Sequence, residues 1–483
     1  MLEKNNKYID LFCGAGGLSL GLENAGLELL YSSDVDKNCI ETFKHNLKSI
    51  NSKFNKNSII HSDIQELYKY LGTKRIYKKR VGIKTIKTGK EKSLLNQKQN
   101  ISEEQIKKLQ AIDNLDLLCG GPPCQGFSMI GRAKHGTIKE RAEGFINDSR
   151  NNLFKYFLKF AEKYQPKIIL IENVKGLTSA ANYRDLILEN ISKTSPGYTV
   201  VSHVLNAKDY GIPQNRERLF FIAVRNDINK EYNISPQKIF IDIYESKNNF
   251  RMHSLADAIY DIPQIKSNPK SNNYKIENEI SFNNKNTFGM DVSDLDYSTL
   301  VNTDNTYIKR INTFKGKNIK PSKLYNHKSR YHNKRDKYIY MNLHEGKYLN
   351  HSDNHIALNG DGKNFNGVDY VKKTNSKGDK IVSGFSDKYF KLDSKSVSKT
   401  IIAHLETDGN SYVHPPIKRN KNKLDYARSI TPREAARIQS FPDWYFFKGS
   451  LRNQFRQIGN AVPPQLAFEI GKIIKKHLDK IDG

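Results

Sequence analysis

The sequence is poor in cysteine and has no long apolar run. Its 483 residues include only four cysteines, Cys13, Cys39, Cys119 and Cys124, which form no CxxC pair and no metal-ligand cluster with histidines. These spacings argue against a disulfide framework and predict no metal site, and free thiols fit a reducing compartment. No stretch is apolar enough to span a bilayer, and the first residues, MLEKNNKYIDLF, lack the pattern of a secretory signal. We therefore expect a cytoplasmic protein with no membrane segment.

Acidic residues are scarce relative to basic ones. The chain has 79 Lys and Arg against 51 Asp and Glu, a formal charge of +28. Such an excess favours an acidic partner, and nucleic acid is the obvious one, because phosphate neutralisation drives much of its binding. The alternative is codon bias, since a chain crowded with Lys, Asn and Ile is typical of an AT-rich genome. The length indicates two or three domains, and 37% hydrophobic residues suffice for a folded core.

Residues 1–225 alternate apolar and amphipathic segments. The pattern predicts strands at 8–12, 27–34, 58–63, 115–121 and 167–174, two strands within 198–225, and helices at 18–26, 37–46 and 152–164. This alternation is typical of an α/β fold with a mostly parallel, doubly wound sheet covered by helices on both faces. Ligands of such sheets bind at the carboxyl ends of the strands.

The rest of the chain is less regular. Residues 226–427, rich in Asn, Lys, Ser and Asp, predict a second, irregular and smaller domain, and patterning returns from 428, with a final helix at 463–478. A basic insertion at 72–114 interrupts the first domain. Its most basic part, 72–92, is either a solvated loop or a phosphate-binding arm, and we favour the loop.

A glycine turn follows the first predicted strand, in the stretch DLFCGAGGLSLG. Gly14, Gly16 and Gly17 let backbone amides at the start of a helix approach a ligand, although the stretch is not the dinucleotide pattern GxGxxG. Asp34 and Asp63 end the next two predicted strands, where one carboxylate suits ribose hydroxyls and the other an adenine amino group. Together these groups predict an adenosine site. The alternative is that both aspartates only cap helices or turns.

A second candidate site surrounds Cys124. Pro122 and Pro123 make the preceding loop stiff, so that the thiol would be held at one point, where its thiolate could act as a nucleophile. Glu172 ends the fifth predicted strand at the same edge and could protonate an electron-poor ring. The alternative, which is favoured for this residue taken alone, is a plain ion-pair partner. Alternation along the last strand is expected to point Arg216 and Arg218 to one face, where they could hold a phosphate or a carbonyl oxygen.

Six motifs then indicate a family. DLFCGAGG, GGPPCQGFS, ENV, QNRER, ITPREAARIQSFPD and QIGNAVPP occur in the order in which the DNA (cytosine-5) methyltransferases carry theirs, and they cover residues 8–225 and 428–478. The chain resembles this family, in its prokaryotic restriction-modification type. The resemblance implies a fold of the S-adenosylmethionine-dependent methyltransferase type. It assigns residues 1–225 to the catalytic domain, 226–427 to a target-recognition domain, and 428–483 to a segment that completes the catalytic domain.

The resemblance also implies a role for individual residues. Cys124 matches the nucleophile that adds to carbon 6 of cytosine, Glu172 the residue at ring nitrogen 3, and Arg218 and Arg216 the arginines near the base carbonyl and a phosphate. The expected S-adenosylmethionine contacts are Phe12, Gly14, Gly16, Gly17, Asp34, Val35, Asp63, Ile64, Gly121, Leu153 and Asn460. Three positions depart from the family: Asp34 replaces a usual Glu, Val35 a bulkier residue, and Ala461 a residue with a hydroxyl.

The implied activity is methyl transfer from S-adenosylmethionine to carbon 5 of a flipped-out cytosine in a specific double-stranded DNA sequence, through a covalent cysteine adduct and without a metal. The expected partners are double-stranded DNA in the nucleoid, with the enzyme acting as a monomer, and a cognate restriction endonuclease. A tRNA cytosine methyltransferase with a similar core is the alternative within the enzymes. A catalytically inactive relative that only binds nucleic acid or a partner methyltransferase is the alternative outside them. An NAD-linked dehydrogenase is disfavoured, because the turn lacks the third glycine.

Overall fold

A computed structural model describes the chain at residues 6–50, 56–72, 101–123, 152–179, 183–267, 305–348, 373–374, 380–381, 389–416 and 423–482. The chain forms two compact units. The first unit comprises residues 1–210, 217–251 and 461–483, and the second unit comprises residues 211–216 and 252–460. The first unit therefore draws on both ends of the chain.

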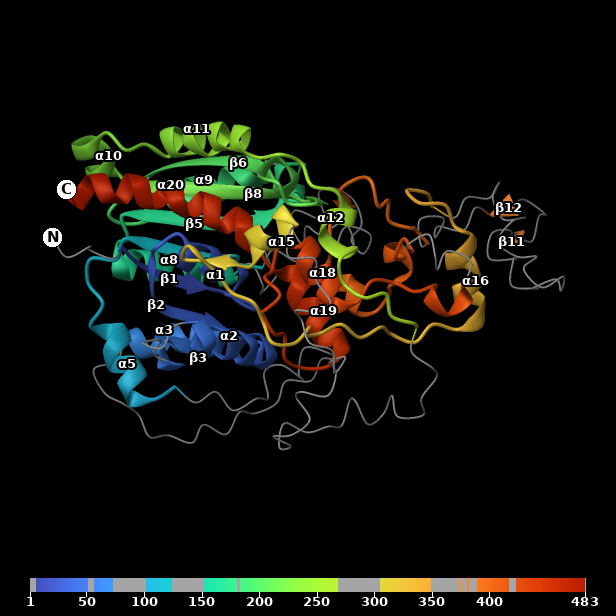
Figure 1. Ribbon diagram of the computed structural model, residues 1–483. Helices are drawn as coiled ribbons and strands as arrows, with labels where there is room; N and C mark the ends of the chain where they lie inside the picture. Colours follow the sequence, from blue (N-terminus) through green and yellow to red (C-terminus); the bar gives the residue numbers. More distant parts are fainter. Residues whose placement is uncertain are drawn as a thin grey trace. The chain divides into compact units, whose positions relative to one another are not determined.

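The first unit is an α/β body (Figure 1). Its strands are β1 (Lys7–Leu11), β2 (Glu28–Asp34), β3 (Ile59–His61), β4 (Leu117–Gly120), β5 (Ile168–Val174), β6 (Tyr198–Asn206) and β8 (Glu217–Arg225). Its α-helices are α1 (Gly17–Asn24), α2 (Lys37–Ile50), α3 (Ile64–Gly72), α5 (Glu103–Gln110), α8 (Asn152–Tyr164), α9 (Tyr183–Lys193), α10 (Asn226–Tyr232), α11 (Pro236–Ser246) and α20 (Pro464–Asp482). Single 3₁₀ turns are η1 (Lys56–Ser58), η4 (Lys175–Ser179), η5 (Ala207–Tyr210) and η6 (Lys247–Asn249).

The seven strands form one sheet in the order β3-β2-β1-β4-β5-β8-β6. The strands from β3 to β5 pair in parallel, whereas β8 runs antiparallel to both of its neighbours. The chain moves outward from β1 to β3 on one side and from β4 onward on the other. The direction of winding therefore reverses between β1 and β4, and in sheets of this type such a switch point is where ligands bind.

The predicted α/β fold class is confirmed, and all seven strands predicted within residues 1–225 are present. The sequence analysis did not predict α3, α5, α9, α10 or α11. Of the insertion at 72–114, residues 73–100 lie outside the described residues. Residues 103–110 form α5, which Ser102 and Gln105 cap reciprocally and which buries Ile106 and Leu109. This end of the insertion is part of the packed unit.

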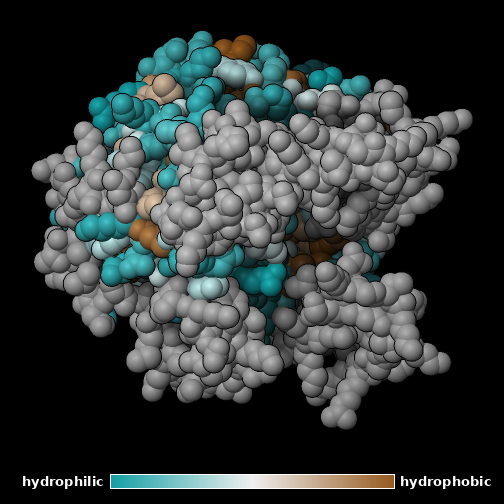
Figure 2. Space-filling view, turned by 90° about the vertical axis from the view of Figure 1, so that its right-hand side faces the viewer, coloured by the Kyte–Doolittle hydropathy of each residue, from teal (hydrophilic) through white to brown (hydrophobic). Residues whose placement is uncertain are grey.

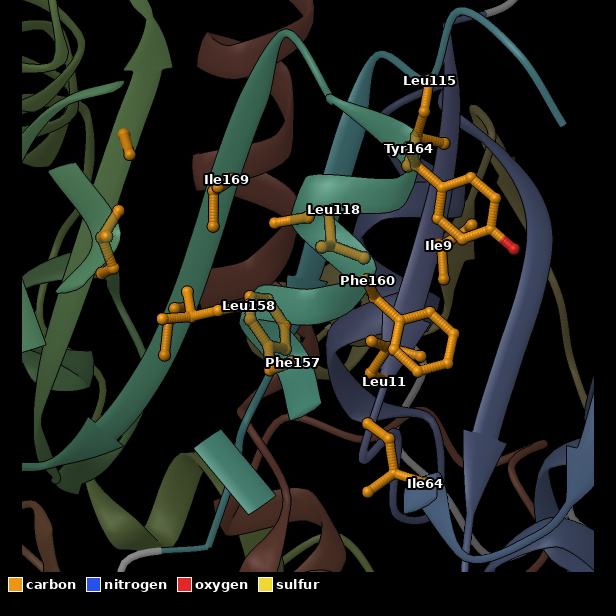
Figure 3. Packing of buried hydrophobic residues seen from close by; sticks show 14 of the residues in the cluster. Ile9, Leu11, Ile64, Leu115, Leu118, Phe157, Leu158, Phe160, Tyr164 and Ile169 are labelled. Carbon is orange, nitrogen blue, oxygen red and sulfur yellow. The ribbon is translucent and has the colours of Figure 1, made fainter. Parts of the chain in front are cut away.

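One face of the sheet packs on α3, α5, α8 and α9. Ile9, Leu11, Leu118 and Ile169 point from the strands toward the aromatic side chains of α8, as Figure 3 shows for Phe157 and Phe160. The helix presents its apolar side because its apolar residues recur at three- and four-residue spacing. Full burial of such a side chain contributes about 2 kcal/mol.

The opposite face packs on α1, α10, α11 and α20. Tyr8 donates to the carbonyl of Ser19 in α1 at 3.1 Å, which ties β1 to that helix. A Cβ at Gly21 would lie 2.4 Å from Cβ of Ala467, so α1 and α20 approach closely because both carry small residues there. Helix α20, red in Figure 1, thus lies among elements from the start of the chain.

Within its described residues, the second unit has little regular structure. Its α-helices are α12 (Leu255–Ile259), α15 (Thr306–Ile311), α16 (Lys334–Asn342), α18 (Pro432–Ile438) and α19 (Leu451–Asn460). Its short strands are β7 (Gln214–Asn215), β9 (Thr313–Phe314), β10 (Lys317–Asn318), β11 (Lys373–Thr374), β12 (Lys380–Ile381) and β13 (Ser398–Lys399), and its 3₁₀ turns are η8 (Ala403–Glu406), η9 (Asn410–Tyr412) and η11 (Leu424–Tyr426). The functional division into a catalytic domain (1–225 with 428–483) and a recognition domain (226–427) stays a prediction, and the boundaries of these compact units are different ones.

Buried ion pairs hold the second unit together around α18. Arg437 binds Asp443 through two hydrogen bonds of 2.7 and 2.8 Å, and Arg428 binds Glu434 through two of 2.7 Å. All four side chains are at most 1% exposed. Although burial raises it, the pKa of Glu434 is held well below its usual range by Arg428 and His414. Two-point pairing of this kind compensates the cost of burying charge.

Two histidines of the second unit, His327 and His332, are also buried there. His332 lies 3.1 Å from the backbone N–H of Ser429 through Nε2, so this nitrogen accepts and Nδ1 carries the proton. Burial lowers the pKa of His332 to about 3 and that of His327 to about 4, so both stay neutral. These two side chains are therefore part of the core of the second unit.

Large exposed apolar side chains are scattered among the described residues. The most exposed are Met252 at 71%, Ile241 at 46% and Leu186 at 43%. On the face drawn in Figure 2 the coloured surface is mostly hydrophilic, with small brown areas. Among the described helices, none combines the length and the apolar character that crossing a membrane requires.

The neutral state of His332 predicts acid sensitivity of the second unit. The unfolded chain takes up a proton near pH 6.5, whereas the folded chain resists it down to pH 3, so stability is lost as the pH falls. We expect the wild type to lose about 2 to 3 kcal/mol more than His332→Gln between pH 6.5 and 4.5. Urea unfolding followed through Trp444, the single tryptophan, measures this difference. Equal pH slopes for the two proteins would contradict it.

Candidate functional site

The glycine turn after β1 has a left-handed backbone. Phe12, Gly14 and Gly16 have φ values of 61°, 53° and 81°, and Gly16 is the N-cap of α1. A Cβ at Gly16 would lie 2.3 Å from the ring of Phe43 in α2, so packing excludes any side chain there. At Gly14, by contrast, a Cβ would meet nothing within 4 Å. The turn is thus closed on its Gly16 side and open at Gly14, next to the buried first residue of α1, Gly17.

Asp34 joins the ends of β1 and β2. Its Oδ2 accepts from the N–H of Gly14 at 2.9 Å, and its Oδ1 accepts from the N–H of Asp36 at 2.8 Å. Burial raises the pKa of Asp34 to about 6, and the two amide bonds oppose that rise. Each carboxylate oxygen can accept more than one hydrogen bond, so acceptor capacity for hydroxyl groups is left.

The third strand end is built differently. Asp63 accepts from the N–H of Gln65 at 2.8 Å and so caps the start of α3. A capping role was the alternative to ligand binding that the sequence left open for this residue. His61 bonds the carbonyl of Val35 at 3.0 Å through Nε2 and so links β3 to β2. Ile64, 4% exposed, packs its side chain into the main core. Asp34, Val35 and Asp63 therefore lie at adjacent strand ends, as predicted.

On the other side of the switch point, Glu172 pairs with Arg218. Their Oε1 and Nε atoms are 3.0 Å apart, and the side chains are only 13% and 14% exposed. Arg218 in β8 lies opposite Val174, two residues along β5 from Glu172, so the pair is a diagonal neighbour pair across antiparallel strands. Burial lowers the pKa of Arg218, and Glu172 opposes that shift. Oε2 of Glu172 lies 3.3 Å from where a Cβ of Gly121 would be.

Arg216 does not share this environment. It belongs to the second unit, where it is 1% exposed and donates to the carbonyls of Ile401 at 2.7 Å and Gly459 at 3.1 Å. Gln214 is equally buried and bonds the N–H of Ile401. The expectation that the two arginines act side by side has no support in these contacts. Arg216 is a structural residue of the second unit, and its role at a phosphate stays a prediction.

Three further predicted site residues remain. Leu153 in α8 is partly buried and packs against the main core. Asn460 ends α19 in the second unit and is exposed. Cys124 lies outside the described residues. Within the described part of the chain, no group of three or more His, Cys, Asp or Glu residues could hold a metal ion.

Two polar residues beneath the glycine turn were not predicted from the sequence. Asp10 in β1 accepts from the hydroxyl of Ser19 at 2.6 Å, and both side chains are at most 1% exposed. Burial raises the pKa of Asp10 to about 7, and its Oδ1 has no hydrogen-bond partner. The sequence feature that could have revealed Asp10 is a carboxylate inside the apolar run YIDLF. A carboxylate is unusual there only if the strand is buried on both faces.

The comparisons identify first the class of fold. The structure resembles the crystal structure of a provisionally assigned DNA modification methyltransferase encoded within an E. coli prophage. The two share a TM-score of 0.53 and 21% identity, and the match covers 98% of this chain and 99% of that one. At this identity the likeness establishes the fold alone, which is that of the α/β methyltransferases.

The sequence then gives the family. The profile of the C-5 cytosine-specific DNA methylases matches residues 6–74 and 70–476, so the chain belongs to this family and is a DNA cytosine-5 methyltransferase. A provisionally assigned type II methyltransferase of Oceanobacillus iheyensis is 30% identical over 99% of this chain and 96% of its own length. The type II methyltransferase M.DdeI of Desulfomicrobium norvegicum is 28% identical over 98% of this chain and 89% of its own length. The resemblance drawn from the six motifs is confirmed.

The buried carboxyl of Asp10 predicts an opposite pH effect on the first unit. Its folded pKa lies above the unfolded value of 3.8, so the unfolded chain releases its proton first and stability falls as the pH rises through this window. We expect the wild type to lose about 3 kcal/mol relative to Asp10→Asn between pH 4.5 and 7.5. Urea unfolding followed by circular dichroism at both pH values tests this. An unchanged difference between the two proteins would show that Asp10 is ionised throughout.

Proposed function

We propose that this methyltransferase transfers a methyl group from S-adenosylmethionine to carbon 5 of a flipped-out cytosine in a specific double-stranded DNA sequence, with Cys124 as the nucleophile. The observation that carries the proposal is the Glu172–Arg218 pair at 3.0 Å, which lies beside Gly121, three residues before Cys124. Family membership supplies the reaction class. The pair supplies an acid and a cation near the predicted nucleophile.

The residues at the other side of the switch point fit the methyl donor. The open space at Gly14 leaves room for a ligand against the turn, and Asp34 and Asp63 offer carboxylate oxygens at neighbouring strand ends. A ribose with two hydroxyl donors and an adenine with an amino donor match this set. When bound, S-adenosylmethionine supplies an electrophilic methyl group on a sulfonium. Phe12, Gly16, Gly17, Val35, Ile64, Gly121, Leu153 and Asn460 remain the further contacts that the family resemblance implies.

The chemistry assigned to the chain's own residues is balanced in bonds and protons. The Cys124 thiolate forms a bond to carbon 6, while Glu172 provides a proton at ring nitrogen 3 and Arg218 stabilises charge at the base carbonyl. Carbon 5 then becomes nucleophilic and would take the methyl group, with S-adenosylhomocysteine as the leaving group, and the proton on ring nitrogen 3 returns to Glu172. A water molecule takes up the carbon 5 proton, and cleavage of the sulfur–carbon bond restores the thiolate and leaves 5-methylcytosine. The target base has to leave the stack, because the ring faces are covered within a duplex.

We further propose that the recognition region, 226–427, reads the DNA and that the enzyme protects the sites of a cognate restriction endonuclease. Support comes from the relatives, which are named type II methyltransferases. His327 and His332 are buried in the core of the second unit. We therefore expect other side chains of the recognition region to contact the bases.

Replacing the predicted nucleophile separates catalysis from cofactor binding. We expect Cys124→Ala to abolish methyl transfer, because no sulfur is left to add to the ring, and to keep the affinity for S-adenosylmethionine within about threefold. Incorporation of labelled methyl groups into DNA and calorimetric titration of the cofactor measure the two effects. Cys39→Ala, in α2, is the matched control and should stay active. Full activity of Cys124→Ala would overturn the mechanism. Incorporation into tRNA instead of DNA would favour the tRNA enzyme.

DNA binding should depend steeply on salt. The charge of +28 predicts several phosphate contacts, each of which releases counterions. We expect affinity for duplex DNA to fall about a thousandfold between 50 and 200 mM salt. Fluorescence anisotropy with a labelled duplex gives the slope. A flat response would mean that the basic excess reflects codon usage.

A further inference from the structure

Asn173 lies between Glu172 and Val174 in β5, and its side chain is only 7% exposed. Its amide is engaged at both ends. The Nδ2 group donates to the carbonyl of Pro122 at 3.2 Å, and Oδ1 accepts from the backbone N–H of Val174 at 2.8 Å. A buried amide that is hydrogen-bonded at both ends has a fixed orientation. It therefore fixes the segment that follows β4 relative to β5.

The pairing of β4 with β5 explains why a side chain is needed at this point. Gly120 lies opposite Ile171, so continuing the parallel register by two residues would bring Pro122 opposite Asn173. Proline has no N–H and cannot extend the ladder. The Asn173 side chain donates to the Pro122 carbonyl where the backbone ladder has stopped. One hydrogen bond thus holds the chain as it leaves the sheet.

Glu172 lies close to the same segment. Its Oε2 lies 3.3 Å from the Cβ position of Gly121, and its Oε1 contacts Arg218 at 3.0 Å. Two consecutive residues of β5 therefore face the exit segment, and Asn173 holds it through a hydrogen bond. The chain is then two residues away from Cys124.

We propose that Asn173 is a positioning residue for methyl transfer: by holding the Pro122 carbonyl it sets where the chain reaches Cys124 relative to Glu172. The proposal rests on the proposed role of Cys124. Asparagine is suited to the task because it both donates and accepts. An aspartate of the same shape keeps the acceptor for Val174 but loses the donor and sets a carboxylate oxygen against the Pro122 carbonyl oxygen.

The experiment compares full-length wild type, Asn173→Asp and Asn173→Ala. Three quantities are measured: kcat and KM for methylation, calorimetric affinities for cofactor and DNA, and the rate of covalent complex formation with duplex DNA carrying 5-fluorocytosine. We expect kcat and the rate of complex formation to fall about 10- to 100-fold in both variants, because a displacement near 1 Å has that effect. KM and both affinities should stay within about threefold.

Asn190→Asp in α9 is the matched control, since Asn190 is exposed and also donates to a backbone carbonyl, that of Leu186. It should behave like the wild type. If circular dichroism shows that the Asn173→Asp protein does not fold, the Asn173→Ala protein, which introduces no charge, provides the test. Wild-type complex formation in either variant overturns the proposal, and so does an equal loss of cofactor affinity, which indicates a purely structural role. Failure of the wild type to form the complex rejects the cysteine mechanism itself.

Discussion

The meeting of β1 and β4 is the constraint on which the candidate site depends. A Cβ at Gly120 would lie 2.0 Å from the carbonyl oxygen of Leu11, a separation that no side chain permits. Glycine therefore allows the two central strands to pair up to their carboxyl ends. Because the winding of the sheet reverses between these strands, the glycine turn follows one of them and the exit segment toward Cys124 follows the other. This one contact brings the glycine turn and the exit segment to neighbouring strand ends.

Electrostatics differ between the two sides of that junction. On the side of the glycine turn, burial raises the pKa of Asp34 to about 6 and that of Asp10 to about 7. On the β5 side, Glu172 has its own cation, Arg218. Burial thus favours the neutral form of the carboxyl groups on the first side, whereas the carboxyl group on the second side is paired with a cation.

The second unit shows that motif residues can serve the core. In ITPREAARIQSFPD, Arg433, Glu434, Arg437 and Asp443 are at most 1% exposed, and their charges are satisfied inside the unit. The cap of α18 belongs to the same network, since Thr431 caps the helix and also bonds His327 at 3.0 Å. This motif helped to identify the family by its sequence, whereas its buried side chains have a structural role in the second unit.

The sequence by itself determined the order of the motifs along the chain, the α/β class and the family, because these depend on local periodicity and on short contiguous motifs. It also placed Asp34 and Asp63 at strand ends, since a strand end is a local event. Only the tertiary structure separated Arg218 from Arg216, buried His327 and His332, and joined Asn173 to Pro122. Those outcomes depend on partners distant in the chain, 185 residues away for Arg216 and Ile401 and 51 for Asn173 and Pro122. No local pattern encodes such partners, because burial and pairing are properties of the folded chain.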